Sequence, residues 1–289
     1  MSAGWHWFVV LGTLLSLAFM AWLLFANRHK SNKGTTGHTW DGIEELDNPL
    51  PMWWVGMFVV SIIFMLLYVA YYGGLGNWGG GGNWSSKAQH DAEVAQHEAR
   101  FAPLYAELGS MSEEDLQNDR RAMQVGRRLY LNNCSTCHGV NANGAFGFPN
   151  LTDEEWQWGG DYQAIKTTLV GGRVAAMPPW GPALGEDGVV NMTNYVLMLS
   201  GQDHDADKAA AAKPQYDMLC VACHGTEGKG NAIFGSPDLT NDIWLYGGSA
   251  EQINFTLTHG RNGNMPAQSD ILSEDKIHVL SAYIRSLSQ

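Results

Sequence analysis

The sequence predicts a mainly α-helical protein, in which two transmembrane helices are followed by two tandem copies of a small helical domain. Two long apolar segments near the N-terminus predict the membrane helices, and an internal repeat in the second half predicts the paired domains. Each copy opens and closes with a helix-like pattern, and no apolar–polar alternation is long enough to indicate a sheet. The length of 289 residues suits two modest domains and a membrane anchor.

Segments 5–26 and 51–72 are the predicted membrane helices. Neither contains Asp, Glu, Lys or Arg, and each exceeds the roughly 20 residues that a helix needs to cross the hydrocarbon core. Both carry Trp or Tyr near their ends, as membrane interfaces favour. A cleaved signal peptide would need basic residues before the first apolar run, and residues 1–4 contain none. A buried core helix would be shorter and less uniformly apolar.

The connecting loop, residues 27–50, sets the expected orientation. It contains Arg28, Lys30 and Lys33, whereas neither distal flank has a comparable cluster. The positive-inside rule therefore predicts that the loop is cytoplasmic. We expect a two-pass protein of a bacterial inner membrane, with both termini and the C-terminal domains in the periplasm.

The negative net charge of the chain indicates which kinds of macromolecule it can bind. The formal net charge is -12, and residues 85–289 carry 14 Lys and Arg against 25 Asp and Glu. Nucleic acid is a disfavoured partner, because phosphate binding needs a positive surface. A basic or dipolar protein partner is favoured, and salt should slow its approach by screening.

Residues 1–84 form the predicted membrane anchor, which ends in a glycine-rich segment, 73–84, that predicts a flexible tether. Residues 85–117 are polar but rich in helix formers, with alanine at every third or fourth position from Ala88 to Ala99. An amphipathic helix and a solvated linker both fit this segment.

An internal repeat organises the rest of the chain. The motif that begins at Cys134 recurs at Cys220, an offset of 86, whereas the later matches, such as Met177-Pro178 with Met265-Pro266, have an offset of 88. A two-residue insertion in the second copy explains the difference. We therefore predict a first domain at 118–203 and a second at 204–289, joined by an Asp- and Ala-rich linker near 201–212.

Each copy contains Cys-x-x-Cys-His, which is typical of covalent attachment of a c-type haem. Two thiols about one helical turn apart can reach two vinyl groups on one porphyrin edge, and the adjacent His can then ligate the iron. The predicted cofactors are two haem c groups, attached at Cys134 and Cys137 and at Cys220 and Cys223, with His138 and His224 as axial ligands. A shared zinc site would not explain the larger repeat, and a thioredoxin-like pair would need a strand–helix context that is absent from the pattern.

Met177 and Met265 are the predicted sixth ligands of the iron atoms. They occupy equivalent positions, 39 and 41 residues beyond the respective His, and the insertion accounts for the difference. A thioether ligand raises the reduction potential of haem iron. Arg173 and Arg261, also equivalent, are candidates for haem propionate contacts, although solvated loop residues would fit as well. Trp156 and Trp244 are expected to line the crevices.

The repeats resemble class I cytochrome c domains over roughly residues 118–289, through Cys-x-x-Cys-His, Met-Pro and the Tyr-bearing closing helix. The membrane part resembles the dihaem cytochrome c subunit of cbb3-type cytochrome c oxidase, through the stretch from Trp40 to Pro51, the Trp53-Trp54 pair and Gly-Leu-Gly-Asn-Trp after the second apolar segment. Two departures are the second candidate membrane helix and Gly73-Gly74 in place of an expected Pro-Gly.

This resemblance implies an electron-relay role in aerobic respiration. Family members pass electrons from a periplasmic donor, a soluble cytochrome c, to a monohaem c subunit and on to the haem-copper catalytic subunit of a proton-pumping oxidase. The chain itself would then hold no oxygen-reducing site and no catalytic residue. Two alternatives are a free-standing membrane-bound dihaem carrier and a dihaem peroxidase. The peroxidase would need an open coordination site, which the paired Met-Pro motifs disfavour.

Overall fold

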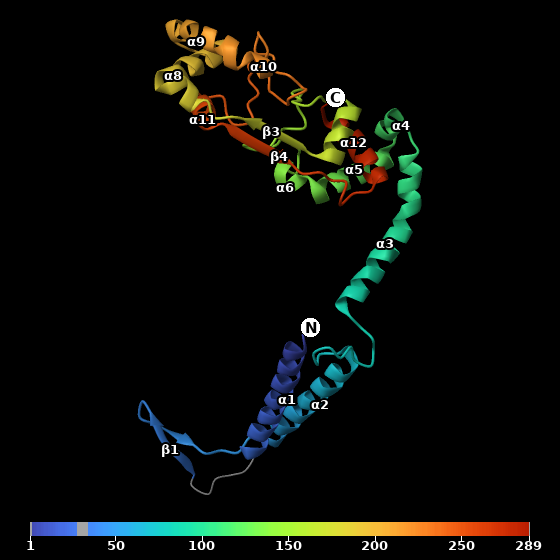
Figure 1. Cartoon of the computed structure of the whole chain (residues 1–289). Helices are drawn as coiled ribbons and strands as arrows, with labels where there is room; N and C mark the ends of the chain where they lie inside the picture. The colour runs from blue at the N-terminus through green and yellow to red at the C-terminus, as the bar shows by residue number, and fades with distance from the viewer. Residues whose placement is uncertain (1, 28–33, 289) are drawn as a thin grey trace. The chain divides into compact units, whose positions relative to one another are not determined.

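The computed structural model describes residues 2–27 and 34–288. The chain forms two compact units, Met1–Arg100 and Phe101–Gln289, and each is described by itself. The predicted mainly α-helical class, with two membrane-type helices ahead of the helical domains, is confirmed (Figure 1).

The first unit is built on two long apolar helices, α1 (Ala3–Ala26) and α2 (Met52–Tyr72). Only Leu24, Val55 and Val69 have buried side chains, and most of the other side chains are exposed. Apolar helices of this length with an uncovered surface are suited to lipid. The predicted segments, 5–26 and 51–72, match both helices to within two residues.

α1 and α2 pack against each other, and a contact near their ends fixes their relative direction. The backbone N–H of Asn77, just beyond α2, donates a hydrogen bond to Nδ1 of His6 in the first turns of α1, at 2.9 Å. The beginning of α1 and the end of α2 therefore lie on the same side. Arg28, Lys30 and Lys33, on which the predicted orientation depends, lie outside the described residues.

The loop between these helices contains a β-hairpin that the sequence pattern did not reveal. Strands β1 (Thr35–Trp40) and β2 (Ile43–Leu46) pair antiparallel. Asp41 and Gly42 form the turn with φ of 49° and 84°. Two consecutive residues with positive φ are typical of the tight turns that match the twist of a hairpin.

The glycine-rich segment after α2 folds back on the helix end. Gly73 ends α2 in the left-handed region, with φ of 74°. The N–H groups of Gly81 and Gly82 donate to the carbonyls of Ala70 and Tyr71, at 2.9 and 2.8 Å. A Cβ on Gly73 would lie 2.5 Å from the Gly79 backbone, so close backbone packing requires glycine here. The flexibility of this tether stays a prediction.

Residues 85–117 are mostly helical. Helix α3 (Ser86–Gly109) is exposed over its first turns and buries Leu108 near its end. Helix α4 (Glu113–Asn118) follows, with the Ser112 hydroxyl accepting a hydrogen bond from the Asp115 N–H at 3.1 Å. The segment is therefore helical up to Gly109, and its amphipathic character stays a prediction.

The two repeats contain the same elements in the same order. The first has α5 (Arg120–Asn133), α6 (Ser135–His138), α7 (Tyr162–Gly171), β3 (Arg173–Met177) and α8 (Gly181–Leu199). The second has α9 (Ala206–Leu219), α10 (Val221–His224), α11 (Ala250–His259), β4 (Arg261–Met265) and α12 (Glu274–Arg285), which a short 3₁₀ turn (Ser286–Ser288) follows. The sequence repeat is therefore a structural repeat.

The repeats do not pack as two separate globules. The opening helix of the first repeat, α5, packs against the closing helix of the second, α12, while α8 of the first packs against α9 of the second. Likewise α7 contacts α12, and α11 contacts α8. The opening helix of each repeat therefore packs on the closing helix of the other repeat, because the chain crosses over between α7 and α8 and again between α11 and α12.

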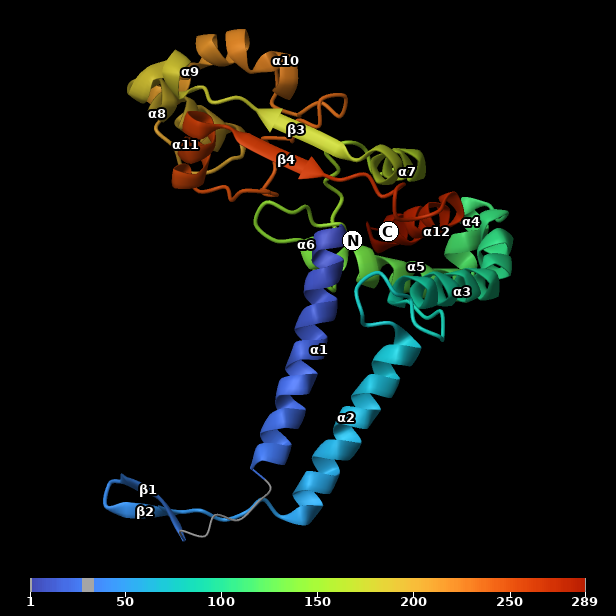
Figure 2. The same ribbon diagram turned by 60° about the horizontal axis from the view of Figure 1, so that its bottom comes forward.

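The crossover is a two-stranded antiparallel ribbon of β3 and β4, which connects the two halves of this unit (Figure 2). The register pairs Arg173 with Met265, Ala175 with Gly263 and Met177 with Arg261. These six residues alternate with more exposed neighbours and so share one face of the ribbon. The sequence pattern predicted no strand here.

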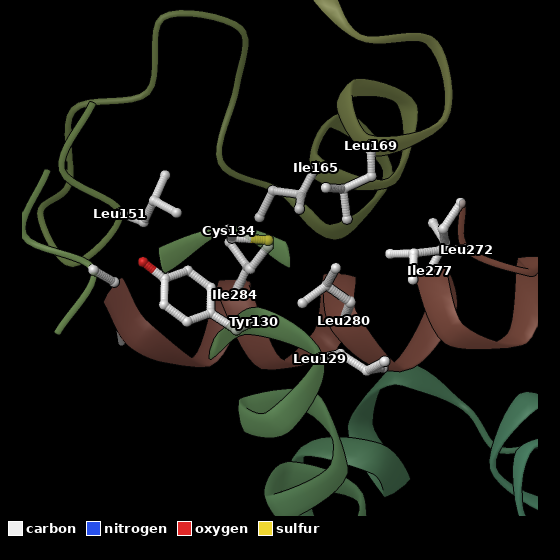
Figure 3. Close-up of a cluster of buried hydrophobic side chains, with 11 residues drawn as sticks. Leu129, Tyr130, Cys134, Leu151, Ile165, Leu169, Leu272, Ile277, Leu280 and Ile284 are labelled. Carbon is white, nitrogen blue, oxygen red and sulfur yellow. The ribbon is translucent and has the colours of Figure 1, made fainter. Parts of the chain in front are cut away.

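Two buried cores follow this crossed arrangement. The first joins Leu129 and Tyr130 of α5 and Ile165 and Leu169 of α7 to side chains of α12, as Figure 3 shows. The second joins α8 and α9 with Ile253 and Leu257 of α11. Each core therefore takes one opening helix, one middle helix and the other repeat's closing helix.

Candidate haem-binding site

Each Cys-x-x-Cys-His motif forms the corner between two helices. Cys134 ends α5 and Cys220 ends α9, and in each motif the His N–H donates to the carbonyl of the first Cys, at 3.0 and 2.9 Å. This single helical turn holds both thiols and the imidazole of a motif together. Gly139 and Gly225 then end the turn with φ of 79° and 77°, which explains the glycine after each His.

A Tyr four residues before each motif stabilises the corner by a hydrogen bond. The Tyr130 hydroxyl donates to the carbonyl of Gly139 at 2.6 Å, and the Tyr216 hydroxyl donates to that of Gly225 at 2.9 Å. Burial raises the pKa of both phenols to about 12, so each remains a donor over the physiological range.

Both His side chains are buried and oriented. Nδ1 of His138 lies 2.9 Å from the carbonyl oxygen of Pro149, and Nδ1 of His224 lies 3.2 Å from that of Pro237. A carbonyl accepts only, so Nδ1 carries the proton and Nε2 keeps its lone pair for a metal. Burial lowers the pKa of His224, which favours the neutral ring that ligation needs.

Cys134 is buried and Cys220 is half-buried, whereas the second thiol of each pair, Cys137 or Cys223, is exposed. Burial, with a smaller contribution from the neighbouring thiol, raises the pKa of Cys134 and of Cys220 to about 11. The four cysteines are free thiols, as attachment of haem through thioether bonds requires. Among the described residues no group of three or more His, Cys, Asp or Glu side chains is arranged to hold a metal ion.

Met177 and Met265 lie in the opposite half to the one that the sequence order suggested. Met265, from the second repeat, packs on the core that contains Cys134, and Met177, from the first, packs on the core next to Cys220. The expected pairing of each His with the Met of its own repeat is therefore not what the structure shows.

Equivalent backbone hydrogen bonds hold both crossed Met segments. The N–H of Trp180, three residues after Met177, donates to the carbonyl of Leu257 at 2.8 Å. The N–H of Gln268, three residues after Met265, donates to that of Leu169, also at 2.8 Å. Both bonds join one repeat to the other at positions offset by 88 residues.

Glycine makes the crossing possible at two equivalent positions. A Cβ on Gly172 would lie 2.5 Å from the carbonyl oxygen of Met265, and one on Gly260 would lie 2.4 Å from that of Met177. Both glycines have a positive φ, of 69° and 73°. Each Met segment therefore passes directly over the end of a middle helix from the other repeat.

One continuous cavity of about 1090 Å³ runs along the ribbon and reaches both motifs. This exceeds the roughly 300–1,000 Å³ of an ordinary small-molecule pocket. Its lining is mainly apolar and includes all the predicted attachment and ligand residues: Cys134, Cys137, His138, Met177, Cys220, Cys223, His224 and Met265. An apolar cavity with paired thiols and an imidazole at each end fits c-type haem.

The two repeated arginines also line the cavity. Nε of Arg173 donates to the Thr168 hydroxyl, and Nε of Arg261 donates to that of Thr256, both at 2.9 Å. The Arg173 guanidinium lies 4.7 Å from the Trp158 ring centroid, and that of Arg261 lies 4.4 Å from the Tyr246 ring centroid. Within the described chain neither guanidinium has a carboxylate within ion-pair distance, so both keep N–H groups available for an anion in the cavity.

Trp156 and Trp244 line the cavity as expected, and the structure explains the glycines that follow them. A Cβ on Gly160 would lie 2.4 Å from the Trp156 ring, and one on Gly248 would lie 2.5 Å from the Trp244 ring. Each indole ring therefore packs directly against the backbone of its glycine, where any other residue would clash. The repeat of this Trp-Gly spacing was visible in the sequence, but its cause was not.

Comparison with known proteins supports a single family. A family model described as cytochrome c oxidase, cbb3-type, subunit III matches residues 121–196 and 207–284, and one described as the N-terminal domain of cytochrome oxidase-cbb3, FixP, matches residues 32–79.

Full-length relatives give the same result. The chain is 45% identical over all of its length to the cbb3-type cytochrome c oxidase subunit CcoP of Rubrivivax gelatinosus, covering 96% of that protein. It is 38% identical, over 89% of its length, to the subunit FixP of Bradyrhizobium sp. (strain ORS 278), covering 95% of that protein. With the FixP of Rhizobium meliloti it shares 33% identity over 91% of its length, and it covers 98% of that relative.

Proposed function

Because the chain belongs to the CcoP/FixP family of cbb3-type cytochrome c oxidase subunits, we propose that it relays electrons from a periplasmic donor to the catalytic subunits of a proton-pumping oxidase. One observation carries this proposal: two equivalent Cys-x-x-Cys-His corners open into the same elongated cavity. Two redox centres joined by one cavity suit a protein that receives an electron at one centre and releases it from the other.

Two haem c groups fit this cavity, one at each end. Cys134 and Cys137 would hold one through thioether bonds, and Cys220 and Cys223 would hold the other. Haem supplies one-electron chemistry at iron when it is bound. The protein supplies an oriented imidazole, a thioether and a largely apolar enclosure.

The axial ligands are proposed to come from both repeats. His138 and Met265 would serve the iron held at Cys134 and Cys137, and His224 and Met177 the iron held at Cys220 and Cys223. The core clusters and the hydrogen bonds of Trp180 and Gln268 support this crossed pairing. The thioether would keep both potentials in a range suited to electron transfer and would leave no open coordination position for peroxide.

Arg173 and Arg261 are proposed as propionate partners. The ribbon register places Arg173 opposite Met265 and Arg261 opposite Met177, so each proposed ligand set gains one cation. A guanidinium held by a Thr hydroxyl and stacked on an aromatic ring is pre-oriented to bind a carboxylate.

The proposed setting is a bacterial inner membrane, with the hairpin loop in the cytoplasm and both termini and the haem domains in the periplasm. Support comes from the hydrogen bond between His6 and Asn77, which places the two distal helix ends on one side, and from the basic residues of the loop sequence. The proposed partners are a haem-copper subunit, a monohaem c subunit and a soluble basic or dipolar cytochrome c donor.

Co-isolation tests the oxidase assignment. Membranes would be solubilised in mild detergent, the complex purified through a tag on this chain, and its subunits and haems per chain quantified. We expect the haem-copper subunit to co-purify with a chain that holds two c-type haems. Recovery of the chain alone, with both haems, would favour the free-standing carrier instead. Peroxide turnover by the isolated chain would favour the peroxidase.

A further inference from the structure

The β-hairpin between α1 and α2 carries an uncovered apolar pair that the electron-relay role does not explain. Trp40 and Ile43 face each other directly across the hairpin next to its turn, and their exposed fractions are 70% and 74%. Directly opposed residues in a hairpin present their side chains on the same face. Leu46, at 64% exposed, lies near the other end.

An isolated two-stranded hairpin is only marginally stable in water. This one has a single side-chain hydrogen bond between its strands among the described contacts, from Thr36 to Glu45 at 3.1 Å. The tight turn fixes the register, and the apolar pair contributes little while water surrounds it. A surface that covered Trp40 and Ile43 would stabilise the hairpin, and large aromatic side chains are favoured anchors at protein interfaces.

The charge of the hairpin distinguishes between a lipid surface and a protein. Residues 34–50 contain four carboxylates, Asp41, Glu44, Glu45 and Asp47, and no Lys or Arg. In the proposed orientation this segment faces the cytoplasmic leaflet, whose anionic lipids repel carboxylates. The three cations of the loop, Arg28, Lys30 and Lys33, precede the hairpin, so a lipid surface is disfavoured for the hairpin itself.

A polytopic membrane protein has the opposite charge at the same position, close to the cytoplasmic surface of the membrane. Cytoplasmic loops of such proteins carry an excess of Lys and Arg close to the ends of their membrane helices. Eight residues separate α1 from the hairpin and five separate the hairpin from α2, so the hairpin stays near the membrane. The family model for residues 32–79 also spans the hairpin and α2 as one region.

We propose that the hairpin, through Trp40 and Ile43 and the surrounding carboxylates, docks on a basic cytoplasmic surface of the haem-copper catalytic subunit. This rests on the proposed function and on the proposed orientation. The hairpin would thus anchor the relay subunit on the face of the membrane opposite to its haem domains. Assembly of the oxidase would depend on it, whereas haem attachment would not.

Site-specific photo-crosslinking in intact membranes tests the contact. A benzophenone amino acid would replace Trp40 in one full-length variant and Thr39, whose side chain lies on the other face of the hairpin, in a control. We expect the substituted position 40 to crosslink the catalytic subunit, identified by peptide mass spectrometry, several-fold more than position 39. Crosslinks to lipid, to another protein or equally from both positions would overturn the proposal.

Charge reversal tests whether assembly of the oxidase depends on the carboxylates of the hairpin. Glu44→Lys with Glu45→Gln, which keeps an oxygen to accept from Thr36, would be compared with Glu93→Lys with Glu98→Gln, at two exposed carboxylates on α3. We expect the amount of catalytic subunit that co-purifies with the hairpin variant to fall several-fold, while the amount of this variant in the membrane, detected by haem staining, is unchanged. The α3 variant should assemble normally. Normal assembly of the hairpin variant would refute the docking.

The two proposals fail in different ways. If the unaltered chain does not co-purify with a catalytic subunit at all, the proposed function itself is wrong. If the unaltered chain co-purifies and position 40 does not crosslink that subunit, the hairpin docking alone is wrong.

Discussion

Met177 and Met265 show how far a single residue can be predicted from sequence. Their equivalent positions identified both as ligand candidates, and both line the cavity. The sequence could not show which iron each Met would serve. The two Met residues occupy equivalent positions in the repeat whether each ligates the haem of its own repeat or the haem of the other repeat. Only the packing of Met265 near Cys134 and of Met177 near Cys220 distinguishes the two arrangements.

Replacement of these thioethers has a defined expected result. Met177→His and Met265→His should each lower the potential of one haem, and not the same one, by on the order of 100 mV, since imidazole favours ferric iron more than a thioether does. Both haems should remain attached, because the thioether bonds are untouched. An optical redox titration of the purified complex measures this, with Met218→His, an exposed position, as control. Two unchanged potentials would rule out Met ligation.

Gly126 lies at the contact between α5 of the first repeat and α12 of the second. A Cβ there would lie 2.5 Å from Cβ of Tyr283, on the closing helix of the other repeat. Gly126→Ala should therefore force α5 away from α12 and destabilise the unit by about 1–3 kcal/mol. Gly171→Ala, at a helical glycine with nothing within 4 Å, is the matched control. Thermal unfolding of the purified protein measures the difference, and equal unfolding temperatures would contradict the close contact.

At the scale of elements, long and strongly patterned segments were predictable and short ribbons were not. The apolar runs predicted α1 and α2 because their length and composition have few alternatives. Strand β4 reads Arg-Asn-Gly-Asn-Met, which has no apolar alternation, since its partner strand and the cavity rather than a core determine its conformation. The β1–β2 hairpin is equally short, and the family signature in that region indicated identity rather than shape.

The ribbon offers a test at its centre. Ala175, paired with Gly263, lines the cavity between the two proposed ligand sets, whereas its neighbour Val174 is 66% exposed. Ala175→Leu adds bulk at a point between both sites and should shift the potentials of both haems, in contrast to the single shift of each Met variant. Val174→Leu should leave both unchanged. A redox titration of the two variants measures this, and a shift confined to one haem would place Ala175 within one site.

At the scale of the whole molecule, the crossed chain makes the two repeats interdependent. Each half takes its closing helix and its Met segment from the other repeat, so the sequence boundaries predicted at 118–203 and 204–289 describe units of sequence repetition. Two proposed haem sites that share a ribbon and a cavity would be held in a fixed relation, which suits transfer of an electron from one to the other.

The charge of the C-terminal part predicts how the proposed donor approaches. Residues 85–289 carry an excess of 11 negative charges, from 25 acidic and 14 basic residues. Reduction by a basic cytochrome c should slow by roughly 10-fold or more between low and high ionic strength, because salt screens the steering field. Stopped-flow reduction at several salt concentrations measures it. A rate that does not depend on salt would show that charge does not guide the encounter.

In the proposed crossed ligation, each haem iron takes its His from one repeat and its Met from the other. A cryo-electron microscopy map of the purified haem-loaded complex tests it directly, since the axial side chains can be traced to their helices. We expect the iron attached at Cys134 and Cys137 to lie between His138 and Met265, and the iron attached at Cys220 and Cys223 to lie between His224 and Met177. Met177 on the first iron and Met265 on the second would contradict it.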